Sequence, residues 1–449
     1  MPITFVNRKK EIELLNRFLN KRNSFIIIYG RRRIGKTTLI KKVVENKDFL
    51  YLFCEEGYKR NLNNLKNIVK EKFSININFE DYKSFFNLIK NIKKDKIVVI
   101  FDEFQNLIEN NNNLIEFQYI IDEIIRNSNI HFVVLGSSIN FMKKLLEYKN
   151  PLYGRRDLSI KLDYLSFFDS MKFFNLNIEE IIKIFGITGG VPLYLRLFKK
   201  FDDVKDLAFN KFGFLYQEID FLLSSEFKEF ANYKLILSAI AKGKNSFNEI
   251  SNYTGIQKSN LFIYLENLIN IGLINRIIPI NESVKTKKSR YFISDNYVSF
   301  YFNFIEKYKE YVELDNLIFY KKFLEEYNSY LGFIFENITK EFIIKKFGKK
   351  INKLGKWWDK EKEIDLIGLN EKKKEVYFFE IKWKNLDLKK VKEIIEDLKD
   401  KSKYFNWNSE KRKEYFCVVA KNINKKAKEW LKSNGFIGFD LRDFEKIID

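Results

Sequence analysis

The chain has 449 residues, of which 45% are hydrophobic and 31% are charged. This is the balance of a folded globular protein, so wholesale disorder is excluded, and the length predicts about three domains. The 81 Lys and Arg residues exceed the 60 Asp and Glu residues, which gives a formal net charge of +21. Such an excess favours an anionic partner such as nucleic acid, although a basic surface exposed to solvent is an equal alternative.

Cysteine and histidine are scarce. Cys54 and Cys417 are far apart and lack CxxC spacing, which excludes a disulfide scaffold and a Cys-rich zinc site and favours the reducing cytoplasm. The one histidine, His131, precedes an apolar segment, which argues against a Ser–His catalytic pair. No apolar run is long enough to span a bilayer, and the first residues lack a signal peptide, so we expect a cytoplasmic protein without a membrane partner.

The first part of the chain alternates helical and apolar segments. Residues 1–23 carry a helical pattern, and helical stretches also separate four apolar segments that predict buried strands. These strands are Ser24–Tyr29, Phe49–Phe53, Ile97–Phe101 and Phe132–Leu135. The alternation predicts a doubly wound α/β domain with a parallel sheet over residues 1–165. Residues 166–230 are helical around Gly189-Gly190-Val191-Pro192 and predict a helical lid.

The next part has the element order of a winged helix. In order, it contains a helix at Tyr233–Lys242, a helix opened by the capping box Ser246–Glu249, a helix at Gln257–Ile271, and strands at Ile274–Ile280 and Arg290–Ser294. This order predicts a winged-helix domain over residues 231–295. Residues 296–330 predict a helical connector, and residues 331–449 predict a C-terminal α/β domain.

A phosphate-binding loop follows the first strand. Residues Gly30–Thr37 match the pattern GxxxxGK(S/T) and precede an expected helix at Thr38–Val44. In such a loop the backbone N–H groups face phosphate oxygens, Lys36 reaches the β and γ phosphates, and the Thr37 hydroxyl ligates Mg²⁺. The sequence therefore predicts a site for ATP and Mg²⁺. Its predicted lining residues are Gly30, Arg31, Arg32, Arg33, Ile34, Gly35, Lys36, Thr37 and Thr38.

Two acidic residues end the strand Ile97–Phe101. Asp102 would belong to the Mg²⁺ shell, and Glu103 would orient or deprotonate the attacking water. The alternative is that both acids cap the following helix. The strand that contains Phe132 ends in Gly136–Asn140, where polar groups could sense the γ phosphate or form a plain polar turn.

Two arginines, Arg155 and Arg156, follow the turn at Gly154. Either is a candidate arginine finger, acting within the chain or on a neighbouring subunit of a homo-oligomer. A plain surface pair is an equal alternative.

Together these motifs resemble the archaeal ATPases of the AAA+-related, STAND-like group. The matching segments are Phe5–Glu11, Gly30–Thr37, Val99–Glu103, Gly136–Ser138, Pro151–Arg156 and Gly189–Pro192. The resemblance covers essentially the whole chain, because that family joins its ATPase to a winged helix and a further C-terminal domain. It implies that Phe5, Val6 and Arg8 lie near the adenine and that the motif ending in Pro192 closes over the nucleotide.

The predicted winged helix has features suited to DNA. Polar residues begin the helix Gln257–Ile271, as expected where a recognition helix meets base edges, namely Gln257, Lys258, Ser259 and Asn260. The predicted wing carries cations opposed by Glu282 alone, namely Lys285, Lys287, Lys288 and Arg290. These cations would neutralise phosphates of bound DNA. A winged helix that serves only as a packing module is the alternative.

The C-terminal part contains two carboxylates and a lysine on an expected hairpin. Strand alternation puts Glu380 and Lys382 on one face, and a hairpin centred on Asn370–Glu375 puts Asp365 opposite Glu380. Two carboxylates can hold Mg²⁺, and a lysine can activate water or stabilise a pentavalent phosphate. Glu336, on an expected helix, would supply a third carboxylate. A cross-strand salt bridge on a solvated face is the alternative.

This pattern of Glu336, Asp365 and Glu380-x-Lys382 resembles the PD-(D/E)xK nuclease superfamily. The resemblance implies a restriction-endonuclease-like fold that cuts DNA or, in a degenerate form, only binds it. The leading hypothesis is an ATPase whose nucleotide state controls a DNA-binding, nuclease-like C-terminal half. The alternatives are a signalling switch whose C-terminal half docks proteins, and a DNA-binding regulator that acts through the winged helix.

Overall fold

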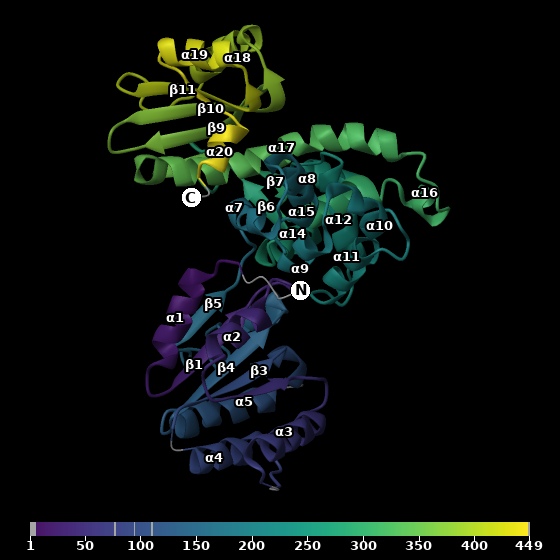
Figure 1. Cartoon of the computed structure of the whole chain (residues 1–449), viewed down its shortest axis with the longest axis vertical. Coiled ribbons are helices and arrows are strands. Elements are labelled where there is room, and N and C mark those ends of the chain that lie inside the picture. The colour runs from purple at the N-terminus through teal and green to yellow at the C-terminus, as the bar shows by residue number, and fades with distance from the viewer. Residues whose placement is uncertain (1–5, 76–77, 94, 109–110, 448–449) are drawn as a thin grey trace. The chain divides into compact units, whose positions relative to one another are not determined.

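The computed structural model of the chain describes residues 6–75, 78–93, 95–108 and 111–447 (Figure 1). Phe5, which the resemblance puts near the adenine, lies outside the described residues. The chain divides into two compact units. The first runs to Tyr164 and also includes Val191–Leu193 and Phe221–Lys228, and the second comprises Leu165–Gly190, Tyr194–Asp220 and the residues from Glu229 onward.

The first unit is built on a parallel five-stranded sheet in the order β2-β3-β4-β1-β5. Its strands are β1 (Ser24–Tyr29), β2 (Phe49–Phe53), β3 (Ile97–Asp102), β4 (Ile130–Gly136) and β5 (Leu158–Lys161). The α/β fold and the four predicted strands are confirmed. The sequence pattern missed β5, because this strand is short and only one of its residues is buried.

Helices pack on both faces of this sheet. They are α1 (Lys9–Leu19), α2 (Lys36–Val44), α3 (Tyr58–Phe73), α4 (Tyr82–Ile92), α5 (Asn111–Tyr119) and α6 (Ile139–Lys144), with helical turns at Phe104–Leu107 and Ile120–Ile125. Successive strand residues point to opposite faces, so β1 gives Ile26 and Ile28 to the cluster under α1 and α2 and turns Phe25 to the other face.

The second face of the sheet is aromatic, and Phe132 of β4 lies at its centre. The ring centroids of Phe25, Phe86 and Phe101 lie 5.5, 5.1 and 5.2 Å from that of Phe132. The Phe117 ring of α5 stacks on the same residue at 5.8 Å. One side chain therefore joins three strands and two helices.

Replacing Phe132 by alanine is expected to lower the free energy of unfolding by about 3–5 kcal/mol, because it empties a fully buried aromatic site. Chemical denaturation followed by circular dichroism measures this loss. Phe53→Ala is the matched control, since Phe53 is 53% exposed, and should change stability by less than about 0.5 kcal/mol. Equal losses in the two variants would contradict this account of the core.

The second unit begins with helices and a small hairpin. The helices are α7 (Phe167–Ser170), α8 (Ile178–Thr188), α9 (Pro192–Leu197), α10 (Val204–Ala208), α11 (Phe214–Ser224), α12 (Ala231–Ala241), α13 (Phe247–Thr254), α14 (Lys258–Asn270), α15 (Asn296–Phe300) and α16 (Lys309–Glu313), and the hairpin joins β6 (Ile274–Ile277) to β7 (Arg290–Ile293). α9 and α11 also reach into the segments grouped with the first unit. Shorter helical turns lie at Met171–Phe173, Phe201–Asp203 and Tyr301–Ile305.

The elements expected between residues 231 and 295 occur in the predicted order. The capping box that opens α13 is present, with Ser246 and Glu249 each bonding the backbone of the other. The expected strand at Ile274–Ile280 stops at Ile277, and the residues after it leave the hairpin.

The long helix α17 (Tyr320–Phe347) leads into a mixed five-stranded sheet, after a turn at Gly348–Lys350. The position of the boundary expected between residues 330 and 331 lies inside α17. The sheet has the order β12-β11-β10-β9-β8. Its strands are β8 (Lys353–Asp359), β9 (Lys362–Asn370), β10 (Glu375–Leu386), β11 (Lys413–Ile423) and β12 (Ile437–Phe439).

The strand β10 is central in this sheet, antiparallel to β9 and parallel to β11. In Figure 1, α18 (Leu388–Ser402) and α19 (Lys425–Ser433) cover one face, and α17 and α20 (Leu441–Glu445) lie on the other. Across the described residues of both units, none of the helices combines the length and apolar character needed to cross a membrane.

Candidate functional site

The predicted phosphate loop lies between β1 and α2. Gly30 must be a glycine, because a Cβ atom there would collide with the backbone carbonyl of Leu162. Gly35 precedes α2 with a φ of 94°, a left-handed conformation that glycine adopts without strain. Lys36 is 5% exposed, and its Nζ donates to the carbonyl oxygens of Gly30 at 2.8 Å and Arg31 at 3.1 Å. The ammonium thus lies inside the loop.

The Lys36 ammonium is held in an acidic environment. Burial lowers the pKa of Lys36, whereas the nearby carboxylates of Glu103 and Asp102 oppose that shift. A buried cation whose hydrogen bonds go to loop carbonyls is suited to an anionic ligand such as a phosphate.

Asp102 connects the loop to the end of β3. Its Oδ2 accepts hydrogen bonds from the Thr37 hydroxyl at 2.6 Å and from the Tyr51 hydroxyl at 2.7 Å. Burial, with the bond to Asp102, raises the pKa of Tyr51, so this hydroxyl stays a donor. Tyr51 was not found from the sequence, because its place beside Asp102 depends on the pairing of β2 with β3.

Glu103 faces the tip of β4 and does not cap the next helical turn. It has a φ of 54° and makes no side-chain cap to Phe104–Leu107. Its Oε2 accepts from the Ser137 hydroxyl at 2.5 Å, from the Ser137 backbone N–H at 3.2 Å, and from the Gln105 side-chain amide. The geometry therefore favours the expectation of a carboxylate at the phosphate end of the sheet over the capping alternative.

The remaining predicted residues of the nucleotide site lie in the loop or close to it. Ile34 belongs to the core, and the Arg31 guanidinium donates to the Tyr164 hydroxyl at 3.2 Å. A Cβ atom at Gly35 would lie 4.0 Å from Pro192, so Pro192 is beside the loop. Arg8 donates to the Asp163 carbonyl at 2.5 Å. Arg32 is exposed, and Arg33 and Thr38 are half-buried.

The strand positions argue against the prediction that Arg155 acts as an arginine finger within the same chain, and they place Arg156 beside it. Arg155 and Arg156 precede β5, at the amino end of the parallel sheet, whereas the phosphate loop follows the carboxyl end of β1. The Arg155 guanidinium donates to both carboxylate oxygens of Asp122, at 3.0 and 2.9 Å. The sequence could not show this, because β5 was not recognised. A finger supplied by a neighbouring subunit stays a prediction.

Two parts of the chain match known protein families. Residues 5–198 match the family described as an ATPase domain predominantly from Archaea, and residues 301–394 match a family of archaeal and bacterial proteins of unknown function. The chain is also 41% identical over 451 residues to uncharacterized protein MJECL04 of Methanocaldococcus jannaschii, covering 98% of this chain and 100% of that protein. The chain belongs to this archaeal ATPase family.

Two further comparisons agree with this assignment. The ATPase is 59% identical over 55 residues to uncharacterized ATP-binding protein MJ0423 of Methanocaldococcus jannaschii, covering 12% of the ATPase and 93% of that protein. The solved Walker-type ATPase PABY2304 of Pyrococcus abyssi superposes with a TM-score of 0.51 and 20% identity, covering 66% of this chain and 96% of that one. At this identity the likeness concerns the fold alone. The chain is an ATP-binding ATPase.

A second cluster lies on the C-terminal sheet of the ATPase. The Lys382 Nζ lies 2.7 Å from Glu380 Oε1 and 3.5 Å from Asp365 Oδ2. The backbone N–H of Ile381 donates to Asp365 at 2.8 Å. Lys401 of α18, which the sequence gave no reason to select, lies 3.6 Å from Glu380 Oε1. The expected juxtaposition of Asp365, Glu380 and Lys382 is thus present.

The carboxylates of the cluster are largely buried, whereas the Lys382 side chain is partly exposed. Glu380 is 5% exposed, and its Oε2 is buried with no hydrogen-bond partner among the residues that the structure describes. Burial raises the pKa of Glu380, the Asp365 carboxylate raises it further, and Lys382 opposes both. The Lys382 pKa is itself raised, because Asp365 and Glu380 more than offset its burial. Lys382 thus forms ion pairs with two carboxylates that are largely shielded from solvent.

Glu336 is close to the cluster but has its own partner. Lys356 donates to the Glu336 carboxylate, and burial raises the pKa of Glu336 while Lys356 opposes the rise. In the parts of the chain that the structure describes, no group of three His, Cys, Asp or Glu side chains is placed to hold a metal ion. Glu336 is therefore not positioned as a third metal ligand in this conformation.

The structure corrects the prediction that Glu282 alone opposes the cations of the wing. Besides Glu282, the wing cations meet acids of the β8–β9 hairpin, since Lys288 lies 2.9 Å from Asp359 and Arg290 lies 3.0 Å from Glu363. Sequence reasoning missed these pairs because the partners are more than seventy residues apart. Lys285 and Lys287 are exposed.

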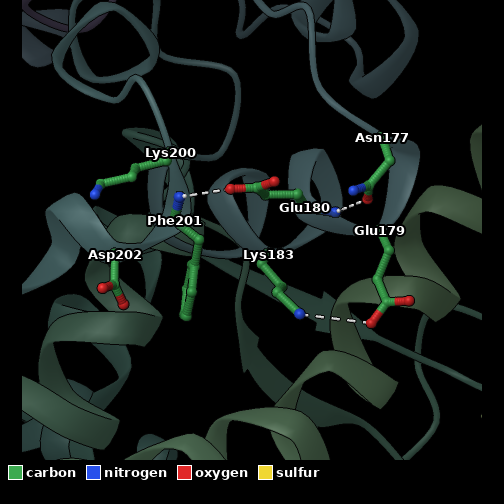
Figure 2. Close-up of a pocket in the computed structure, with 7 residues that line it drawn as sticks. All are labelled: Asn177, Glu179, Glu180, Lys183, Lys200, Phe201 and Asp202. Atoms are coloured by element: carbon green, nitrogen blue, oxygen red, sulfur yellow. Dashed lines mark hydrogen bonds and ion pairs between the residues drawn. The ribbon is translucent and has the colours of Figure 1, made fainter.

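A separate open pocket of about 570 Å³ lies at the start of α8 (Figure 2). It is lined by Asn177, Glu179, Glu180, Lys183, Lys200, Phe201 and Asp202. Its charges are largely paired within the second unit: Glu179 lies 2.7 Å from Lys421 and 3.5 Å from Lys183, and Asp202 lies 3.1 Å from Lys205. The lining includes none of the predicted site residues.

Proposed function

We propose that this ATPase uses its nucleotide state to control a DNA-binding and DNA-cleaving C-terminal half. The cluster of Asp365, Glu380 and Lys382 carries the proposal, because Glu380 Oε2 is buried and has no hydrogen-bond partner among the described residues. This oxygen leaves an acceptor position that a metal ion would fill, so the cluster fits a metal ion.

At the nucleotide site, Lys36 would contact the β and γ phosphates, and Thr37 and Asp102 would hold Mg²⁺. The bond between Thr37 and Asp102 supports this role, because it brings both oxygen donors to one place. Glu103 would accept a proton from the attacking water once it leaves Ser137. The bound Mg²⁺ would neutralise charge on the phosphates.

At the C-terminal site, Asp365 and Glu380 would hold Mg²⁺, which polarises a phosphodiester and lowers the pKa of bound water. Two carboxylates are sufficient protein ligands for Mg²⁺, because this ion keeps several waters and shares phosphate oxygens. Lys382 would orient the attacking water or stabilise charge on the phosphate. Because the Glu336 carboxylate is paired with Lys356, we do not assign Glu336 as a ligand of this Mg²⁺.

DNA binding is proposed for the segment from α12 to β7, which has the element order of a winged helix. Lys258, Ser259 and Asn260 are exposed at the start of α14, where a recognition helix would meet base edges. Lys285 and Lys287 remain the wing cations available to phosphates.

Purified protein incubated with duplex DNA and Mg²⁺ is expected to cut the DNA when ATP is present and to cut it more slowly with ADP, because the proposed control depends on the γ phosphate. Gel analysis of a supercoiled plasmid measures this. ATP hydrolysis without cutting under any condition favours the signalling switch, in which the C-terminal half docks proteins. Duplex binding that weakens steeply with salt, again without cutting, favours the DNA-binding regulator.

A further inference from the structure

The tip of β4 carries a second carboxylate beside the phosphate loop. β4 pairs with β1, and the Gly30 N–H donates to the Gly136 carbonyl at 3.3 Å, so the tip adjoins the start of the loop. Ser137 binds Glu103, as described above. The next residues bind Glu226, which is 87 positions further along the chain than Ile139.

Glu226 reaches three donors at this tip. Its Oε1 accepts from the Ile139 backbone N–H at 3.0 Å, and its Oε2 accepts from the Asn140 N–H and the Ser138 hydroxyl, both at 3.5 Å. The Glu226 carboxylate and the Lys36 ammonium also interact electrostatically. Burial raises the pKa of Glu226 to about 7, and the backbone donors and Lys36 oppose the rise. The Glu226 carboxylate therefore lies within electrostatic range of Lys36, the lysine expected to bind phosphate.

The segment that carries Glu226 has an unusual place in the chain. Phe221–Lys228 is grouped with the first unit, although the residues directly before and after it belong to the second unit. Two of its three bonds to the tip are at the long limit for hydrogen bonds. Phe221–Lys228 thus contacts β4, although the residues on either side of this segment are grouped with the second unit.

We propose that Glu226 is a specificity-determining residue that weakens binding of a nucleoside triphosphate relative to a diphosphate, and that the γ phosphate displaces Glu226 from the β4 tip. Lys36 of a phosphate loop reaches the β and γ phosphates, so the γ phosphate would compete with Glu226 for this cation and be repelled by its charge. A diphosphate lacks that group and leaves Glu226 in place. This inference rests on the nucleotide site proposed above.

Equilibrium binding of a non-hydrolysable ATP analogue and of ADP, each with Mg²⁺, tests the inference on the full chain. At about pH 8, where Glu226 is mostly charged, Glu226→Gln is expected to tighten analogue binding about tenfold, the size expected for one charge acting through partly solvated protein. Binding of ADP should change by no more than about twofold. Glu229→Gln removes an exposed carboxylate three positions away and should alter neither affinity.

An equal change for both nucleotides, no change, or weaker analogue binding would overturn the proposal. Amide hydrogen exchange of wild-type Phe221–Lys228 gives a test that needs no variant. Exchange there should rise with the analogue and not with ADP, and identical exchange in both complexes would also overturn the proposal. Failure of the wild-type protein to bind either nucleotide would instead refute the nucleotide site on which the proposal rests.

Discussion

Replacing Lys36 by alanine is expected to lower the rate of ATP hydrolysis by at least about 100-fold, the loss typical when a charge-stabilising donor is removed. Lys36 lies buried inside the loop, where its ammonium donates to the carbonyl oxygens of Gly30 and Arg31. Steady-state phosphate release measures the rate, and a thermal melt checks that the variant is folded.

Glu103→Gln should reduce hydrolysis by a similar factor but leave ATP binding intact, because glutamine keeps the shape of the side chain and cannot accept the proton of the attacking water. Lys42→Ala is the matched control, since Lys42 is on the same helix, is exposed, and forms an ion pair with Glu45 at 2.6 Å. If turnover is unchanged in both Lys36→Ala and Glu103→Gln, the assignment of the hydrolytic site is wrong.

Replacing Asp365 or Lys382 by alanine is expected to reduce metal-dependent DNA cutting by at least about 100-fold while the rate of phosphate release from ATP stays the same. Asp365 would lose a metal ligand, and Lys382 is the cation closest to both carboxylates. Plasmid nicking and ATP hydrolysis, measured on the same protein samples, separate the two sites.

Glu380→Gln tests the metal site more specifically, because it keeps the volume of the side chain and removes the negative charge that would bind the metal ion. Glu396→Gln provides the control, since Glu396 is exposed on α18. Cutting that persists at the wild-type rate in Asp365→Ala, Lys382→Ala and Glu380→Gln would show that the nuclease activity does not belong to this cluster.

The parts predicted from sequence are those that depend on local pattern. β1 and β2 have the expected bounds, because unbroken apolar runs mark strands buried in a parallel sheet. The phosphate loop was recognisable because its glycines and Lys36 are contiguous. The pairing Leu366↔Phe379, which ends one residue short of Asp365 and Glu380, is the register expected for a hairpin centred on its turn.

The parts that were missed depend on contacts distant in sequence. Tyr51 and Glu226 reach the nucleotide site from a neighbouring strand and from a later segment, and neither belongs to a motif. Lys401 reaches Glu380 from a helix that crosses the sheet. The wing pairs of Lys288 and Arg290 join the β6–β7 hairpin to the β8–β9 hairpin, so no local pattern could reveal their partners.

The helix α17 restricts how this protein can vary in length. Its 28 residues span about 42 Å, and it packs Phe323 against Phe300 near one end and Phe342 against Phe444 near the other. Inserting one residue between these contacts would rotate everything downstream by about 100° and advance it by about 1.5 Å, so both contacts could not survive together. Insertions and deletions should therefore be confined to the loops that flank α17, whereas substitutions at its exposed positions keep both contacts in register.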